Sequence, residues 1–146
     1  MKFWISVTSK DHVLAGLADG FTQAHGEKAE QLHLLNEGDI IFFYSPGTLF
    51  RRGEILQAFT AVARVTDRAP QQVKMSGYAK TAGKPQPWRR TISPLPSEEA
   101  RLAALVPELE FITDKANWSA AMGRSLFAIG EADARRIAAA MNASLT

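Results

Sequence analysis

The sequence predicts an α+β fold in which a small, mostly antiparallel β-barrel carries helices packed on its outside. Two apolar, β-rich runs, residues 40–44 and 53–65, are separated by a Pro/Gly loop, a pattern typical of neighbouring strands. Further short strand-like segments follow one another along the chain instead of alternating with helices. Because a doubly wound sheet needs that alternation, the order of elements favours the barrel.

The first third of the chain contains a strand, a helix and an irregular segment. Residues 2–8 alternate and are rich in β-forming side chains, which predicts a strand. Residues 10–18 predict a helix that Ser9 caps and Gly20 ends, with its apolar positions on one face. Residues 21–26 have no clear periodicity, and residues 27–35 favour one or two helical turns.

The two central runs come next, and Ser45-Pro46-Gly47 is expected to end the first of them. Residues 71–75 and 88–92 predict two more strands. Residues 76–87, rich in Gly, Lys and Pro, predict a mobile loop between them. Alternation along 88–92 places Trp88, Arg90 and Ile92 on one side of the strand and Arg89 and Thr91 on the other.

The last third predicts two helices and a strand. Ser97 is expected to cap a short helix that ends at Pro107, and Phe111, Ile112 and Trp118 are expected to pack against the barrel. Residues 126–129 predict a final strand. Residues 131–142 predict an amphipathic helix, whose buried positions at i, i+3, i+4 and i+7 are Ala134, Ile137, Ala138 and Met141.

Size and composition indicate one globular domain, residues 1–146, with 46% apolar and 22% charged residues. Cysteine is absent, so disulfides and cysteine metal sites are excluded. No apolar run is long enough for a membrane span and the N-terminus lacks the pattern of a signal peptide, so we expect a cytoplasmic protein. Residues 51–90 hold nine basic and two acidic side chains, which is how a face that contacts phosphates would look, although a solvated basic loop would look the same.

Neither catalysis nor metal binding has a sequence signature here. The three histidines are spaced by 13 and 8 residues, which matches no common zinc motif. No nucleophile elbow, Walker loop or Gly-x-Gly-x-x-Gly is present. We therefore predict no catalytic set, no metal and no cofactor.

Binding has more support, because several aromatics stand beside polar side chains. Phe21 precedes Thr22 and Gln23, and Tyr44 precedes Ser45. A base held out of its stack needs an aromatic face for stacking and amide or main-chain groups that read its edge. These aromatics could also be core residues; we expect Phe21 and Trp88 at the surface or in a pocket.

Short pieces along most of the chain together resemble the EVE domain family. They are Phe3-Trp4-Ile5, Ser9 to Val13, Gly20 to Gln23, His25-Gly26 with Lys28, Gly38 to Ile41, Tyr44-Ser45-Pro46, Gln57 to Ala61, Arg89-Arg90, Phe111-Ile112, Trp118 and Leu126-Phe127. The resemblance implies a PUA-like twisted β-pseudobarrel with flanking helices, related to YTH and ASCH domains. It further implies a non-catalytic reader of a modified, for example methylated, base in DNA or RNA, with a nuclease or another defence-system protein as a possible partner.

Carried onto this sequence, the resemblance implies a base-binding pocket and a rim. The pocket would be lined by Val7, Thr8, Ser9, Phe21, Gln23, Tyr44, Ser45, Pro46, Gln57 and Phe59. Contacts at the rim or with phosphates would come from His25, Lys28, Arg51, Arg52, Trp88, Arg89 and Arg90. YTH cages are built from tryptophans, whereas this chain has Phe21 after the helix, which favours a neutral modified base over a cationic one.

Two other functions remain open. Some ASCH relatives resemble small hydrolases of modified nucleosides or RNA, and Lys28 with Glu27 or Glu30 could serve as a catalytic pair. Alternatively, the basic stretch could dock an acidic protein partner.

Overall fold

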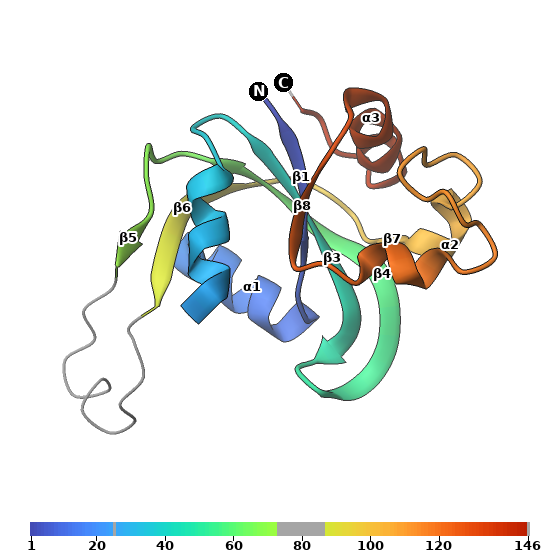
Figure 1. The fold of residues 1–146 in the computed structure, drawn as a ribbon, viewed down its shortest axis with the longest axis horizontal. Helices are drawn as coiled ribbons and strands as arrows, with labels where there is room; N and C mark the ends of the chain where they lie inside the picture. The colour runs from blue at the N-terminus through green and yellow to red at the C-terminus, as the bar shows by residue number, and fades with distance from the viewer. Residues whose placement is uncertain (25, 73–86, 146) are drawn as a thin grey trace.

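The computed structural model describes residues 1–24, 26–72 and 87–145, with the backbone alone for residues 26–28 (Figure 1). Its elements in chain order are β1 (Phe3–Val7), α1 (Lys10–Asp19), β2 (Phe21–Ala24), η1 (Gly26–Leu34), β3 (Ile40–Leu49), β4 (Arg52–Val65), β5 (Gln71–Gln72), β6 (Trp88–Leu95), β7 (Ala100–Arg101), α2 (Leu102–Leu105), η2 (Trp118–Met122), β8 (Leu126–Ile129) and α3 (Glu131–Ala140). The elements η1 and η2 are 3₁₀ helices.

One strongly curled sheet organises these elements, with the strand order β2-β6-β4-β3-β1-β8. The short strands β5 and β7 pair with β6 and β4. Only the pairing of β1 with β3 is parallel among the described strands. The predicted α+β fold, a mostly antiparallel and barrel-like sheet with flanking helices, is confirmed.

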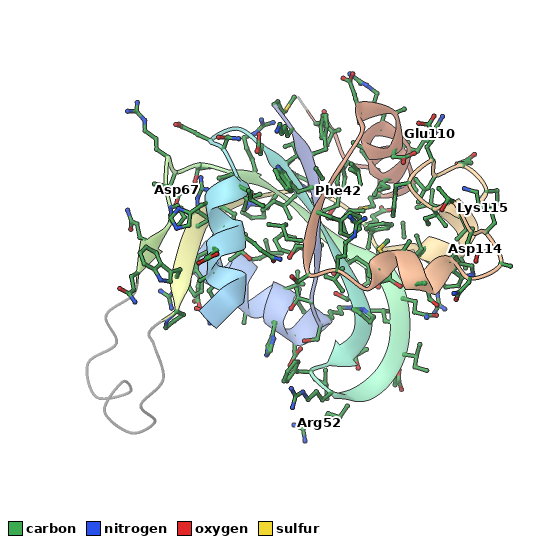
Figure 2. The ribbon with its side chains drawn as sticks, in the orientation of Figure 1. Phe42, Arg52, Asp67, Glu110, Asp114 and Lys115 are labelled. Atoms are coloured by element: carbon green, nitrogen blue, oxygen red, sulfur yellow. The ribbon has the colours of Figure 1, made fainter. Side chains whose placement is uncertain are left out.

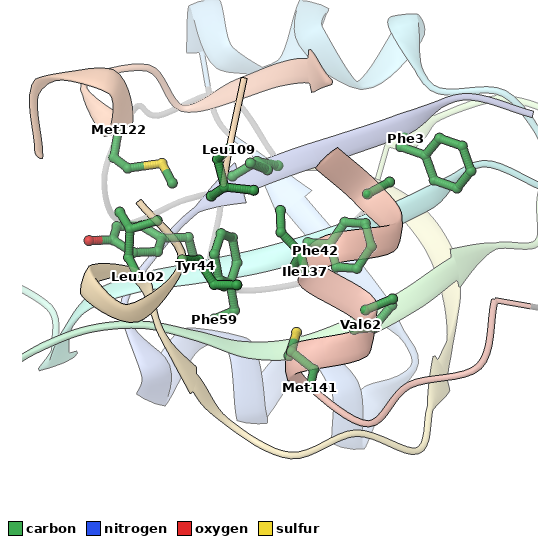
Figure 3. Close-up of a cluster of buried hydrophobic side chains, with 14 of the residues drawn as sticks. Phe3, Phe42, Tyr44, Phe59, Val62, Leu102, Leu109, Met122, Ile137 and Met141 are labelled. Carbon is green, nitrogen blue, oxygen red and sulfur yellow. The ribbon is translucent and has the colours of Figure 1, made fainter. Parts of the chain in front are cut away.

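Side chains on the two faces of the sheet form two separate cores. Phe42 and Tyr44 of β3 belong to the first core, which α2 and α3 cover; Figure 3 shows part of it. Ile41 and Phe43 point the other way, into a second core that α1 and η1 cover. This arrangement follows from the two-residue period of a strand, and it buries β3 on both faces.

Several predicted elements are confirmed with small changes of length. The first strand, the helix after Ser9, the strand at 126–129 and the C-terminal helix all form. Gly20 ends α1 with a left-handed φ of 81°. The four predicted buried positions of the last helix are all buried.

Two predictions about boundaries are wrong, and one segment without a predicted element forms a strand. β3 does not stop at Ser45 but continues to Leu49, because its pairing with β4 absorbs the Pro/Gly segment through register shifts. Ser97 caps no helix: residues 100–101 pair with β4, and α2 keeps only residues 102–105. Residues 21–24 form β2, which pairs with β6.

Two predictions concern the segment between β5 and β6, and most of it lies outside the described residues. Of the strand predicted at 71–75, the described part is Gln71–Gln72. The loop predicted at 76–87 lies outside the described residues except for Pro87.

Candidate ligand-binding cavity

A cavity of about 1100 Å³ opens between α1, β2, η1 and the hairpin of β3 and β4. Its floor is the second core, which contributes Val13, Leu35, Ile41 and Phe43. Because α1 and η1 cover that core only in part, apolar side chains reach the cavity wall there. The cavity therefore combines an apolar floor with the polar groups described next, as small-molecule and base sites do.

Ser9 supplies a buried polar group to the cavity without a partner. It is the N-cap residue of α1, but its hydroxyl makes no capping hydrogen bond. Its main-chain oxygen accepts from Val13 N at 3.1 Å, while its side chain is only 8% exposed. Oγ has no hydrogen-bond partner among the described residues and lines the cavity. A buried hydroxyl without a partner is costly, so a ligand is the natural partner for it.

Asp11 lies beside Ser9 in the first turn of α1. The Ser9 hydroxyl is the main cause that holds the pKa of Asp11 below its ordinary value of 3.8. The two groups still fall short of hydrogen-bond geometry, and within the described chain Asp11 Oδ1 has no partner. Asp11 itself is not among the residues that line the cavity.

The β2–β6 wall holds three of the predicted site residues together. Arg89 pairs with Gln23 in register and donates a hydrogen bond from Nε to Gln23 Oε1 at 3.2 Å. The guanidinium carbon of Arg89 also lies 3.6 Å from the centroid of the Phe21 ring. The result is a stack of a planar cation on an aromatic ring, beside an amide whose NH₂ group is left for a ligand.

A second polar corner was not predicted. Ser125, just before β8, donates a hydrogen bond from Oγ to Gln31 Oε1 at 2.7 Å, and both residues line the cavity. This contact joins residues 94 positions apart. Gln31 lies in a stretch that the sequence indicates only as helical turns, so no local pattern marks it as a site residue.

The tip of the β3–β4 hairpin forms the outer rim. Phe50, Arg51 and Arg52 are exposed there and line the cavity. The ring of Phe50 stacks on His12 of α1, with 5.3 Å between the ring centroids. His12, whose spacing from the other histidines matches no zinc motif, lines the cavity too.

The structure brings about half of the predicted site residues to this cavity. Those that line it are Val7, Thr8, Ser9, Phe21, Gln23, Pro46, Arg51, Arg52 and Arg89. The side chains of His25 and Lys28 lie outside the described residues. The same holds for Glu27, so its predicted pairing with Lys28 is outside the description too.

The other predicted site residues lie elsewhere. Tyr44 and Phe59 are buried in the first core, where their rings meet edge to face at 5.5 Å; burial raises the pKa of Tyr44 to about 12. Ser45 is fully buried and its hydroxyl lies 2.8 Å from that of Thr60. Gln57 is half-buried on β4 and does not line the cavity.

Trp88 and Arg90 do not line the cavity either. They share the face of β6 opposite to Arg89, as alternation predicts. Trp88 lies against His33, with ring centroids 5.9 Å apart. Arg90 is fully buried and paired with Asp67 at 2.6 Å. Neither side chain is placed to contact a ligand in the cavity.

The described part of the chain shows neither a candidate metal site nor a candidate membrane-spanning helix. No cluster of three or more His, Asp or Glu side chains there could hold a metal ion. None of the described helices has the length and apolar character needed to span a membrane.

Comparison with known proteins decides the family. Residues 2–140 match the EVE domain. The chain belongs to the EVE domain family. A UPF0310 protein of Mycolicibacterium vanbaalenii is 41% identical over 141 residues, which cover 97% of this chain and 93% of that protein. The UPF0310 protein YdcG of Bacillus subtilis is 32% identical over 145 residues, covering 99% and 94%.

Solved structures extend the likeness to two other domain types. An ASCH protein of Zymomonas mobilis has a TM-score of 0.58 and 10% identity, with 96% of each chain covered. A YTH domain of Zygosaccharomyces rouxii in complex with N6-methyladenosine RNA has a TM-score of 0.59 and 12% identity, covering 93% of this chain and 83% of that one. At such identities the likeness shows the fold alone, which confirms the expected PUA-like fold.

Proposed function

We propose that this EVE domain binds nucleic acid and holds a modified base, such as a methylated one, in the cavity without catalysing a reaction on it. The observation that carries the proposal is Ser9. Its hydroxyl is buried and has no partner among the described residues, and it lines the cavity. A base edge offers both donors and acceptors, and either would satisfy this hydroxyl.

The rest of the cavity fits a flat, partly polar ligand. A base would stack against the Arg89–Phe21 pair, whose guanidinium covers the ring at 3.6 Å. The amide NH₂ groups of Gln23 and Gln31 could donate to acceptors on its edge, because each amide oxygen is already engaged. A methyl group would lie on the apolar floor, where burial of one such group contributes about 0.8 kcal/mol.

Cations at the rim fit the phosphates of a strand. Arg51, Arg52 and Arg89 all line the cavity, and none of the three forms an ion pair within the described chain. Unpaired guanidiniums are the groups that hold phosphates without reading sequence. The YTH neighbour, which binds RNA that carries N6-methyladenosine, supports the proposal through its shared fold.

The test is a titration with short DNA and RNA oligonucleotides, single- and double-stranded, each plain and with a methylated adenine or cytosine, at two salt concentrations. We expect an oligonucleotide with one of the modified bases to bind more tightly than its plain counterpart at both salt concentrations. The preference should fall in Ser9→Ala and in Phe21→Ala. Ser119→Ala is the matched control, because Ser119 is exposed on η2 and does not line the cavity.

Two results would contradict the proposal. Equal, salt-sensitive binding of all oligonucleotides would mean a basic surface without base readout. Conversion of a modified nucleoside or RNA into product, lost in Lys28→Ala, would make the protein a hydrolase.

A further inference from the structure

The tip of the β3–β4 hairpin exposes apolar side chains beside cations. Leu49, Phe50 and Ile55 are 40%, 54% and 83% exposed, which is unusual for large apolar residues. Arg51 and Arg52 lie between them, and Figure 2 shows Arg52 at the outer end of the hairpin. The hairpin tip, residues 49–55, thus combines an aromatic ring with two guanidiniums that form no ion pair within the described residues.

The backbone of the hairpin tip has two residues with a positive φ. Arg51 has a φ of 58°, which a non-glycine residue rarely adopts. Gly53 has a φ of 88°, and a Cβ there would lie 2.5 Å from the hydroxyl oxygen of Thr48. That hydroxyl accepts a hydrogen bond from Glu54 N at 3.0 Å, which closes the turn. Strain of this kind concentrates at functional sites.

Phe50 is supported in its exposed position. His12 stacks on its ring at 5.3 Å, and the guanidinium carbon of Arg51 lies 4.9 Å from the ring centroid. The exposed Arg51 can move aside for a flat ligand, whereas His12 is anchored on α1. The ring is therefore a ready stacking surface.

Charge and position indicate what occupies this surface. Neither Arg51 nor Arg52 meets a carboxylate in the described residues, so their charges are available to an anion. The tip also lines the same cavity as Ser9 and Phe21, so whatever fills the cavity extends past Phe50. A nucleic acid strand supplies both a flat base and phosphates.

We propose that the hairpin tip binds the nucleotide next to the one in the cavity, with its base stacked on Phe50 and its phosphates held by Arg51 and Arg52. This inference rests on the proposed function and deepens it. A base that stacks on Phe50 must leave its neighbours in a helix, so the preferred ligand is a single strand or a locally opened duplex.

The test uses single-stranded DNA oligonucleotides, plain and with one N6-methyladenine, titrated at several salt concentrations. Phe50→Ala and Phe50→Leu should each weaken binding of both oligonucleotides by about 5- to 150-fold, the cost of one lost base–aromatic stack. Phe50→Tyr keeps the ring and should bind within about twofold of the parent. The Leu variant distinguishes stacking from apolar contact. A protein or membrane partner would need only an apolar side chain and would bind this variant.

Variants of Arg51 and Arg52 should change a different quantity, the salt dependence of binding. The double variant Arg51→Gln/Arg52→Gln should flatten the slope of log affinity against log salt by about 1.4, which is about 0.7 per lost phosphate contact on a single strand. The Phe50 variants should leave that slope unchanged. Arg135→Gln, an exposed arginine on α3, is the matched charge control.

The outcomes separate this inference from the proposed function. Unchanged binding in Phe50→Ala overturns the hairpin inference, and so does full binding in Phe50→Leu. A loss confined to the methylated oligonucleotide overturns it too, because Phe50 would then belong to the pocket. If the parent shows no preference for the modified base while Phe50→Ala still weakens both ligands, the stacking surface stands and the base-reading function fails.

Discussion

The guanidinium carbon of Arg89 lies 3.6 Å from the centroid of the Phe21 ring, so the arginine covers one face of the phenylalanine. The two residues come from β6 and β2, which pair with each other, and Gln23 holds the arginine by a hydrogen bond. At the β2–β6 wall, a base in the cavity would stack on the guanidinium of Arg89, which in turn lies on the ring of Phe21. Arginine and ring therefore act as one platform.

We predict that Arg89→Lys weakens binding of a modified oligonucleotide by about tenfold, although the charge is kept. Lysine has no planar group that can stack, and its ammonium is a point charge. The slope of affinity against salt should stay as in the parent. The measurement is the same titration at several salt concentrations. A lysine variant that binds as tightly as the parent would show that Arg89 contributes charge alone.

The neighbouring arginine has a structural role, and we predict that Arg90→Met lowers the free energy of unfolding by about 3–5 kcal/mol. Arg90 is fully buried, and its Nε donates to Asp67 at 2.6 Å. Its Nη1 donates to the carbonyl oxygens of Leu32 and Leu35, at 2.7 and 2.5 Å, which ties η1 to β6. Removing the arginine takes a hydrogen-bond donor away from each of these acceptors.

Urea unfolding of Arg90→Met and Arg89→Met measures the difference between the two positions. Arg89 is half-buried and, among the described residues, contacts the neutral amide of Gln23 and the ring of Phe21 but no carboxylate, so its variant should unfold closer to the parent. Adding Asp67→Asn to Arg90→Met should restore part of the loss, because a partly buried carboxylate that has lost its cation is then made neutral. Equal stability of the two single variants would contradict this role of Arg90.

How far the sequence determines the site is clearest at Tyr44. The resemblance implies that Tyr44 lines the pocket, yet Phe43 does so and Tyr44 belongs to the opposite core. A strand that is buried on one face shows alternation, which reveals its inward side chains. β3 is buried on both faces from Ile40 to Ser45, so the sequence carries no such signal there.

Long-range pairing explains most other differences. β2 has no strand pattern of its own and forms because Phe21–Ala24 pairs with β6, some 65 residues later in the chain. Gln31 lines the cavity and contacts Ser125, which lies 94 positions later in the chain, so no local pattern could reveal this contact. Elements with a clear local period, such as α3 and β8, are predicted well, because their pattern and their packing agree.

We predict that Gly16→Ala destabilises the protein, even though alanine is the better helix former by up to about 1 kcal/mol. A Cβ at Gly16 would lie 2.5 Å from the main-chain oxygen of Phe21, closer than real contacts allow. α1 would have to move away from β2, at a cost of about 1–3 kcal/mol. Thermal unfolding checks the sign; a higher melting temperature than the parent would show that the helix has room. Because Phe21 moves with β2, binding should weaken as well.

Asp11 should make the stability of the protein depend on pH in the acid range. Its folded pKa is lowered below 3.8, chiefly by the Ser9 hydroxyl, so the carboxylate form is favoured by folding. The resulting stabilisation is complete above pH 3.8 and is lost as the pH falls through the lower folded value. Asp11→Asn should therefore be less stable than the parent at neutral pH and equal to it once Asp11 of the parent is protonated in both the folded and the unfolded state.

Urea unfolding over a pH series measures this difference, with Asp19→Asn as the control for removing an acid from the same helix. Ser9→Ala should shrink the Asp11 effect, because the largest cause of the lowered pKa is then missing. Ser9 would thus be linked to stability at acid pH through Asp11 and to ligand binding through a hydroxyl that makes no hydrogen bond within the described residues. A gap between parent and Asp11→Asn that persists unchanged at the lowest pH would mean that Asp11 acts through packing, since protonation would then not matter.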